Sequence, residues 1–191
     1  MDSPRIPVIL ASQSPRRIEL LKTVIKNFRV VPSKIEELCD KDLSPEENAI
    51  FLGRKKATWV AKQHPHNLVI GADTMVVLKN EIIGKPSDAE NARQILRQLS
   101  GQEHKVITGV AVVHSKIFSA ASISHVRIKA LTQNVINSYV ESGEPMDKAG
   151  AYAIQGEGSF LVESYSGSYS NIIGLPMDLL KDLLQKSNFS I

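Results

Sequence analysis

The sequence VILASQSPRRIELL, residues 8–21, predicts a strand, a turn and a helix in succession. Residues 8–11 form a short apolar run, which is typical of a buried strand. Ser14 stands where an N-cap residue is preferred, and Pro15 stands at the first helical position, where a missing N–H has no cost. Apolar residues then recur at helical spacing, so the stretch indicates a strand–turn–helix unit of an α/β fold.

Strands and helices alternate beyond this unit, with a hairpin of long strands in the middle of the chain. Ser44 with Glu47 and Ser87 with Glu90 form two capping boxes, which mark helix starts. The expected elements are a strand at 28–31, a helix at 44–63, strands at 68–78 and 82–83, a helix at 87–100, strands at 105–113 and 117–129, a helix at 132–140, a strand at 160–162 and a helix from 176. This order predicts an α/β domain with a mixed sheet flanked by helices.

The composition bounds the class of protein. The chain has 191 residues, and 23 Lys and Arg against 20 Asp and Glu give a net charge of +3. That excess is too small to indicate a nucleic-acid binder, and the length fits one domain, with two lobes as an acceptable variant. The single cysteine, Cys39, cannot form an internal disulfide, and neither a signal peptide nor a membrane span is evident. We therefore expect a soluble, cytoplasmic protein without membrane association.

The first candidate site is the turn Ser12-Gln13-Ser14-Pro15-Arg16-Arg17. Backbone N–H groups and the dipole at a helix N-terminus favour an anion, whereas cations are disfavoured there. Two arginines in the first helical turn are therefore explained by a bound phosphate. The alternative is a solvated turn with two surface arginines.

The second candidate is Asp73, in the stretch Gly71-Ala72-Asp73-Thr74 of an apolar strand. A carboxylate in a buried strand is costly unless it is paired or binds a metal. Asp73 is thus a candidate metal ligand or general base, or else a strand-end carboxylate that caps a turn.

Three further groups are ambiguous when taken alone. Lys85, in a Gly-Lys-Pro turn, can contact a phosphate or can be an exposed turn lysine. The triplet 54–56 is basic, but adjacent helical residues point in different directions, so at most one or two of the three can face a site. The pair Glu36-Glu37 looks solvated. Gln155 lies among glycines at 150, 156 and 158, and its amide suits the edge of a base, although a glycine-rich turn explains the same pattern.

Four blocks of the sequence resemble the Maf, or septum-formation-inhibitor, family of nucleoside triphosphate pyrophosphatases. The blocks are LASQSPRRIELL (10–21), GADTMVV (71–77), GKPSDAENARQILRQLSGQEHKVITGV (84–110) and EPMDKAGAYAIQGEGSFLVESYSGSYSNIIGLP (144–176). The resemblance implies one Maf-like domain over residues 1–191, with two lobes around a central cleft and a fold similar to the inosine triphosphate pyrophosphatases. It also implies a homodimer.

The same resemblance implies roles for particular residues. Asp73 matches the proton acceptor of the family, and Glu37 would help it to hold Mg²⁺ or Mn²⁺. Lys56 and Lys85 match the lysines of the family's helix and of its GKP turn, and the phosphate-loop residues are Ser12, Arg16 and Arg17. These cations would offset charge that develops on a nucleoside triphosphate.

Base preference also follows from the resemblance. Arg16, Thr74 and Gln155 match the branch that favours dTTP and UTP. The alternatives are a pyrophosphatase for 7-methyl-GTP or inosine triphosphate, and a non-catalytic nucleotide- or nucleic-acid-binding regulator of cell division. Phe51 and Gly53 depart from the residues usual in the family, which puts the packing of their helix in question.

Overall fold

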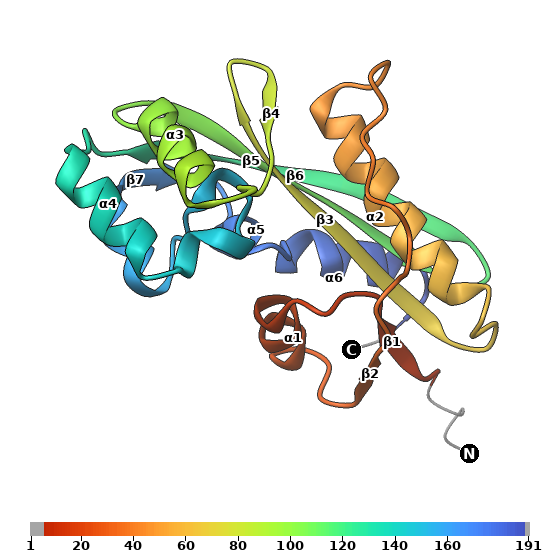
Figure 1. Cartoon of the computed structure of the whole chain (residues 1–191). Coiled ribbons are helices and arrows are strands. Elements are labelled where there is room, and N and C mark those ends of the chain that lie inside the picture. Colours follow the sequence, from red (N-terminus) through yellow and green to blue (C-terminus); the bar gives the residue numbers. More distant parts are fainter. Residues whose placement is uncertain (1–5, 190–191) are drawn as a thin grey trace. The chain divides into compact units, whose positions relative to one another are not determined.

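The computed structural model describes residues 6–189, and it is a mixed α/β structure (Figure 1). Its strands form one sheet in the order β2-β1-β3-β5-β6-β7, with β4 paired to β3. The strands are β1 (Val8–Leu10), β2 (Phe28–Val30), β3 (Leu68–Leu78), β4 (Glu81–Ile83), β5 (Glu103–Val113), β6 (Ile117–Ile128) and β7 (Val162–Ser166). β1 runs parallel to β2 and β3, whereas β3–β4 and β6–β7 are antiparallel. The predicted mixed sheet is confirmed.

Helices flank this sheet. The α-helices are α1 (Pro15–Lys22), α2 (Pro45–Ala61), α3 (Ala89–Leu99), α4 (Gln133–Glu141), α5 (Tyr169–Ile173) and α6 (Met177–Lys186), and the 3₁₀ helices are η1 (Glu144–Asp147), η2 (Ala149–Ala151) and η3 (Gly156–Leu161). Within residues 6–189, no helix is long and apolar enough to cross a membrane.

The chain divides into two compact units. The first comprises the described residues up to Asp73, Thr108–Ser122 and the described residues from Gly174 onward, and the second comprises Thr74–Ile107 and Ile123–Ile173. Strands β3, β5 and β6 contribute residues to both units. Each unit has its own core.

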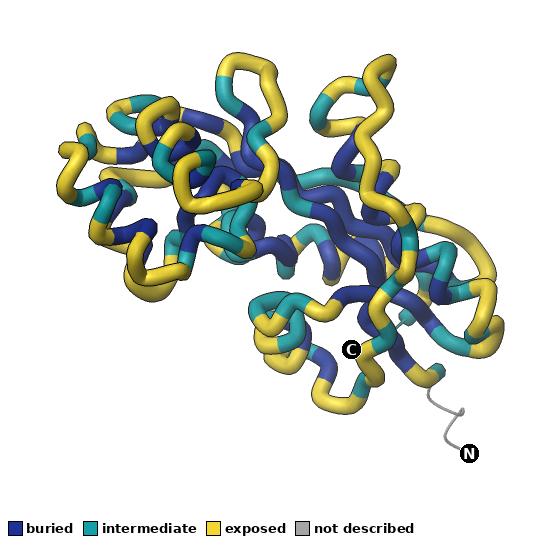
Figure 2. The backbone as a smooth tube through the Cα atoms, viewed as in Figure 1, coloured by how far each residue is buried: buried dark blue, intermediate teal, exposed yellow. Residues whose placement is uncertain are grey.

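The first unit is layered, because successive strand residues point to opposite faces of a sheet. Val8 and Leu10 pack on one face with apolar residues of α1 and α6, whereas Ile9 packs on the other face with Ala57 and Val60 of α2. Figure 1 shows α2 and α6 on opposite sides of β3, and Figure 2 shows the buried positions concentrated along the strands. Asp73 follows the alternation of β3 and belongs to the α2 face.

The second unit has a single apolar core. Apolar residues of α3 and α4 meet those of the strands there, as Leu96, Tyr139 and Val126 illustrate. The turn Lys79-Asn80 between β3 and β4 has positive φ at both residues, as tight hairpin turns require.

Three details differ from the sequence-based expectation. The second capping box is wrong by one residue, because Asp88 is the N-cap of α3 and its carboxylate accepts from the backbone N–H of Asn91. The strand expected at 160–162 begins only at Val162, since η3 occupies the preceding residues. The short helix α5 was not predicted.

Candidate functional site

The turn that follows β1 leads into α1 as the sequence predicts. Ser14 occupies the N-cap position, but its side chain makes no capping hydrogen bond, and the first turn of α1 contains no acidic residue. The hydroxyl of the buried Ser12 accepts a hydrogen bond of 3.2 Å from the backbone N–H of Ser14. The helix start therefore lacks a side-chain anion, and its positive dipole end is suited to an external one.

Arg17 is held by several hydrogen bonds, so it is not the solvated surface arginine that one of the two interpretations of the turn expected. Its Nε donates to the carbonyl of Gly174 over 2.8 Å, and its Nη1 donates to the carbonyl of Ala72 over 2.9 Å and to the Ser12 hydroxyl over 3.4 Å. Burial lowers the pKa of the Arg17 guanidinium, and the carboxylates of Asp73 and Glu37 act in the opposite direction. Arg17 thus ties the start of α1 to the middle of β3 and to Gly174.

Lys56 lies between two carboxylates. Its Nζ is 2.6 Å from Oδ1 of Asp73 and 2.8 Å from Oε2 of Glu37. Lys56 and Asp73 are 6% and 7% exposed, whereas Glu37 is largely exposed. A buried ion pair needs both members, because removing one leaves an uncompensated charge. Of the basic triplet 54–56, only Lys56 is buried, as adjacent positions on a helix dictate.

Glycines allow α2 to lie close enough for this contact. A Cβ at Gly109 would come within 2.1 Å of the Ala49 carbonyl oxygen, and one at Gly71 would come within 2.6 Å of the Gly53 carbonyl oxygen. A Cβ at Gly53 itself would lie 2.8 Å from the Gly109 carbonyl oxygen. The backbone of α2 therefore packs directly on β3 and β5, and the departure at Gly53 is explained by a close approach that leaves little room for alanine.

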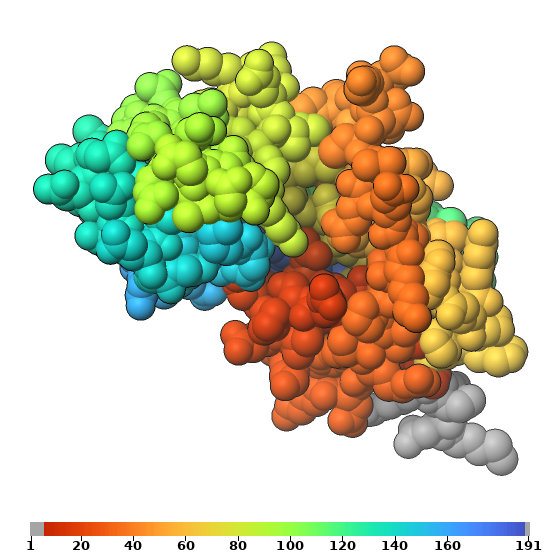
Figure 3. Space-filling model, in the orientation of Figure 1, coloured from red at the N-terminus to blue at the C-terminus, as the bar shows by residue number. Residues whose placement is uncertain are grey.

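Asn48 holds the segment that carries Glu37. The side-chain oxygen of this buried residue accepts a 2.8 Å hydrogen bond from the backbone N–H of Asp40. Its side-chain NH₂ donates hydrogen bonds to the backbone carbonyls of Asp40, Leu43 and Ser44. Figure 3 shows the segment 31–44, in orange, on the visible surface. Asn48 is thus a buried side-chain anchor of a largely exposed segment, which Lys55 also holds through a hydrogen bond to the Glu36 carbonyl. Its role depends on the folded loop and leaves no motif in the sequence.

Thr74, Lys85 and Gln155 belong to the second unit. Thr74 directly follows Asp73 in β3 and therefore points to the opposite face of the strand. The carbonyl of Gly84 accepts a 3.0 Å hydrogen bond from the backbone N–H of Gly150, so the Gly-Lys-Pro turn lies beside the glycine-rich segment. Both Lys85 and Gln155 are exposed.

Two polar contacts of the second unit were missed by the sequence analysis. Nε2 of the buried His104 lies 2.7 Å from the hydroxyl of Tyr152, and the Glu144 carboxylate accepts from the hydroxyl of Tyr139 over 2.8 Å. His104 is a buried residue of β5. The first contact joins residues 48 positions apart, which no local motif could indicate, whereas the second joins residues only five positions apart.

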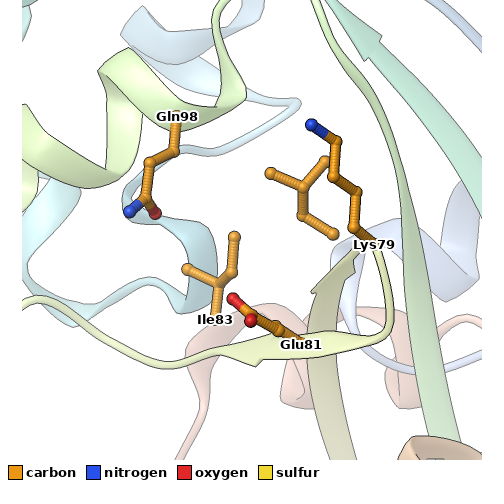
Figure 4. Close-up of a pocket in the computed structure, with 5 residues that line it drawn as sticks. Lys79, Glu81, Ile83 and Gln98 are labelled. Atoms are coloured by element: carbon orange, nitrogen blue, oxygen red, sulfur yellow. The ribbon is translucent and has the colours of Figure 1, made fainter.

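The second unit also contains a pocket with a different set of lining residues. It has a volume of about 320 Å³ and is lined by Leu78, Lys79, Glu81, Ile83 and Gln98. In the close-up of Figure 4, Lys79, Glu81 and Ile83 come from the β3–β4 hairpin and Gln98 comes from α3. None of these residues was predicted to bind substrate.

Together, the fold and the buried lysine–carboxylate cluster define an α/β protein with the charged groups suited to phosphate chemistry. The chain belongs to the family of Maf-like proteins, whose model matches residues 7–187. The resemblance found in the sequence is thereby confirmed.

Relatives agree with this assignment, and a solved structure has a similar fold. A protein of Caldicellulosiruptor saccharolyticus named dTTP/UTP pyrophosphatase is 44% identical over 191 residues, which cover 96% of each chain. Proteins of the same name from Clostridioides difficile and Bacillus velezensis are 44% and 43% identical and cover 94% and 95% of this chain, and 94% and 96% of their own lengths. The Ham1 protein of Staphylococcus aureus is 14% identical, covers 95% of this chain and 99% of its own, and has a TM-score of 0.51, which is a likeness of fold.

Proposed function

We propose that this chain hydrolyses nucleoside triphosphates, with dTTP and UTP preferred, to a nucleoside monophosphate and pyrophosphate. The observation that carries the proposal is the buried contact of Lys56 with Asp73 beside Glu37, in a chain that is 44% identical over nearly its whole length to a protein named dTTP/UTP pyrophosphatase. Its role would be the control of nucleotide pools, including non-standard pyrimidine nucleotides.

Asp73 is the proton acceptor in this proposal. Its carboxylate takes a proton from water, the remaining hydroxide adds to phosphorus, and the bond between the α- and β-phosphates breaks to release pyrophosphate. The Lys56 ammonium, 2.6 Å from Oδ1 of Asp73, fixes the orientation of that carboxylate. Because Lys56 is held on a helix packed backbone to backbone against β3 and β5, the carboxylate is placed before substrate arrives.

A divalent cation, Mg²⁺ or Mn²⁺, fits the donor set of Asp73 and Glu37. Within residues 6–189, no three His, Cys, Asp or Glu side chains gather into a metal cage. Mg²⁺ in particular is usually bound by one or two carboxylates together with waters and substrate phosphates. Asp73 and Glu37 would hold the ion, which neutralises phosphate charge when bound.

The remaining residues are assigned to substrate binding. Ser12, Arg16 and Arg17 lie at an uncapped helix start, which supports a role with phosphate, and Lys85 supplies a further exposed cation. Thr74 and Gln155 are assigned to the base.

We further propose that residues 1–191 act as one Maf-like domain and that the protein is a homodimer in the cytoplasm. Light scattering on the purified protein measures its mass in solution. The mass of a monomer would contradict the proposed dimer.

The decisive experiment is a panel of nucleoside triphosphates incubated with purified protein and Mg²⁺ or Mn²⁺, with release of pyrophosphate as the readout. We expect kcat/KM for dTTP and UTP to exceed the values for inosine triphosphate and 7-methyl-GTP. Asp73→Asn should lower kcat by at least about 100-fold, the lower range for loss of a positioned base. Asp182→Asn, on the exposed face of α6, is the matched control and should be fully active.

Several outcomes would reject the proposal. Absence of pyrophosphate from every nucleotide would exclude a pyrophosphatase, and salt-dependent DNA binding without hydrolysis would instead favour a regulatory protein. A preference for 7-methyl-GTP or inosine triphosphate would keep the chemistry but reject the pyrimidine assignment.

A further inference from the structure

The glycine-rich segment that carries Gln155 is fastened to one carboxylate. Glu144 accepts hydrogen bonds from the backbone N–H of Gly158 over 2.8 Å and from that of Glu157 over 3.3 Å. The same carboxylate accepts a 2.8 Å hydrogen bond from the hydroxyl of Tyr139. Three donors therefore converge on Glu144, two of them from the residues that follow Gln155 within three positions.

The glycines of this segment make room for the contact. Gly156 has a φ of +71°, and a Cβ there would lie 2.3 Å from Oε1 of Glu144. A Cβ at Gly158 would lie 2.4 Å from the Tyr139 hydroxyl and 2.7 Å from the Ala153 carbonyl oxygen. The side chains of Glu144 and Tyr139 thus occupy the space that any other residue at these two positions would need. The glycine-rich pattern reflects this packing.

Tyr139 connects the carboxylate to the core of the second unit. It is 2% exposed, lies on α4 and packs with the apolar residues of α3. Its ring also meets Phe160 of η3 edge to face, with centroids 6.2 Å apart. Glu144 is therefore not a mobile surface carboxylate, because its partner is fixed by the core on one side and its backbone partners lie on the other.

Gln155 needs such support if it is to distinguish bases. Its side chain is exposed, and within residues 6–189 its amide hydrogen-bonds no other group. An amide carries a donor and an acceptor, and a half-turn about its last bond exchanges them. Uracil offers a carbonyl at position 4 and an N–H at position 3, whereas cytosine offers the reverse pair. Only an amide held in one position relative to the base can separate the two.

We propose that Glu144 is a positioning residue for base selection, which acts by fixing the backbone that presents Gln155. Glu144 does not touch the nucleotide in this scheme. It keeps the segment 155–158 in the one conformation in which the amide matches uracil or thymine. The proposal rests on the proposed function, because it presumes that Gln155 contacts the base.

The test compares UTP with CTP, which share ribose and triphosphate and differ only on the base. Glu144→Gln keeps the size of the side chain but presents an NH₂ group to backbone N–H donors. We expect the ratio of kcat/KM for UTP over CTP to fall about tenfold, in the range that a mispaired polar contact produces. Tyr139→Phe removes one of the three donors and should lower the ratio less. Glu144→Asp, which keeps the charge, should retain part of the preference.

A double variant separates positioning from mere stability. If Glu144 acts through Gln155, then Gln155→Ala abolishes the preference and Glu144→Gln adds no further loss to it. Glu141→Gln, an exposed carboxylate three residues upstream, is the matched control and should leave the ratio unchanged. An equal fall of kcat/KM for both nucleotides in Glu144→Gln, or additive losses in the double variant, would overturn the inference. Wild-type protein that hydrolyses neither nucleotide would instead overturn the proposed function.

Discussion

Nζ of Lys56 lies 2.6 Å from Oδ1 of Asp73, and both side chains are buried within the first unit. The contact joins the fourth turn of α2 to β3 across 17 residues of sequence. It exists because glycines at 53, 71 and 109 let the helix backbone approach the sheet. Asp73 is therefore both a member of a structural ion pair and the proposed catalytic base. The first role predicts effects on stability, and the second predicts effects on activity.

Removal of Lys56 should destabilise the protein. Lys56→Met leaves the buried Asp73 carboxylate uncompensated, and we expect the free energy of unfolding to fall by about 3 kcal/mol, the lower end for a broken buried pair. Urea denaturation at pH 7.5 measures this. The double variant Lys56→Met/Asp73→Leu, which removes both charges, should recover most of the stability and none of the activity. A double variant as unstable as the single one would show that the pair itself is not the cause.

Glu37 should matter for metal activation far more than for stability. Its carboxylate is exposed and 2.8 Å from Lys56, so its contribution to the free energy of unfolding should stay below about 1 kcal/mol. If Glu37 and Asp73 hold the cation, Glu37→Gln should raise the Mg²⁺ concentration for half-maximal activity at least about tenfold, because loss of a group that only supports a ligand already costs that much. A magnesium titration of pyrophosphate release measures it, and the neighbouring exposed Glu36→Gln provides the control.

Asn48 should influence the same metal titration from a distance. It touches neither carboxylate, but four hydrogen bonds join it to residues 40–44, which follow Glu37 in the exposed segment. Asn48→Ala removes the partner of backbone groups in Asp40, Leu43 and Ser44, and each lost hydrogen bond costs about 0.5–1.5 kcal/mol. We expect faster amide hydrogen exchange in residues 37–44 and a weaker response to Mg²⁺. Unchanged exchange in that segment would contradict the anchoring role.

Local signals in the sequence were sufficient for most elements of the fold. Ser44 and Glu47 form the expected capping box of α2, and the strand–turn–helix unit at the N-terminus is present. These features depend on residues a few positions apart. The strand expected at 160–162 was wrong because η3 is held by Glu144, whose hydrogen bond to Gly158 spans 14 residues. The short α5 was missed for a similar reason, since Asn171 donates to the Val106 carbonyl across 65 residues.

In the candidate site, too, local signals were visible in the sequence, whereas contacts between distant residues were not. Helical periodicity indicated that one or two residues of the basic triplet could face a site, and the structure buries Lys56 against Asp73 and Glu37. Periodicity could not identify the carboxylate partners, because that requires the packing of α2 on the sheet. Asn48 gave no sequence signal, since its hydrogen bonds are to backbone groups of a folded loop. The assignment of Thr74, Lys85 and Gln155 to substrate stays a prediction.

Substitution of Gly109 should test the close packing of α2. A Cβ at this position would lie 2.1 Å from the Ala49 carbonyl oxygen and 2.4 Å from the Ile50 nitrogen, both backbone atoms that cannot move without displacing the helix. Gly109→Ala should therefore lower the free energy of unfolding by about 3 kcal/mol, as severe overpacking does. Gly84→Ala meets nothing within 4 Å and should change it by no more than about 0.5 kcal/mol. Equal effects of the two substitutions would exclude the proposed packing.

His104 should make the stability of the second unit depend on pH. Burial lowers the pKa of His104 to about 4 from its ordinary value of 6.5, and its ring lies against the buried Tyr152. Because the folded-state pKa is the lower one, the unfolded chain binds more protons between pH 6.5 and 4, and stability falls as the pH drops through this window. At pH 5 the loss attributable to His104 is about 2 kcal/mol.

The measurement is urea denaturation at pH 7.5 and at pH 5, with a probe such as hydrogen exchange of α3, which lies wholly in the second unit. In His104→Gln, which cannot be protonated, the difference between the two pH values should shrink by about the same 2 kcal/mol. His114→Gln, near the turn between β5 and β6, is the control and should keep the wild-type pH dependence. If His104→Gln loses stability equally at both pH values, the histidine serves only to fill the core and to meet the Tyr152 hydroxyl at 2.7 Å.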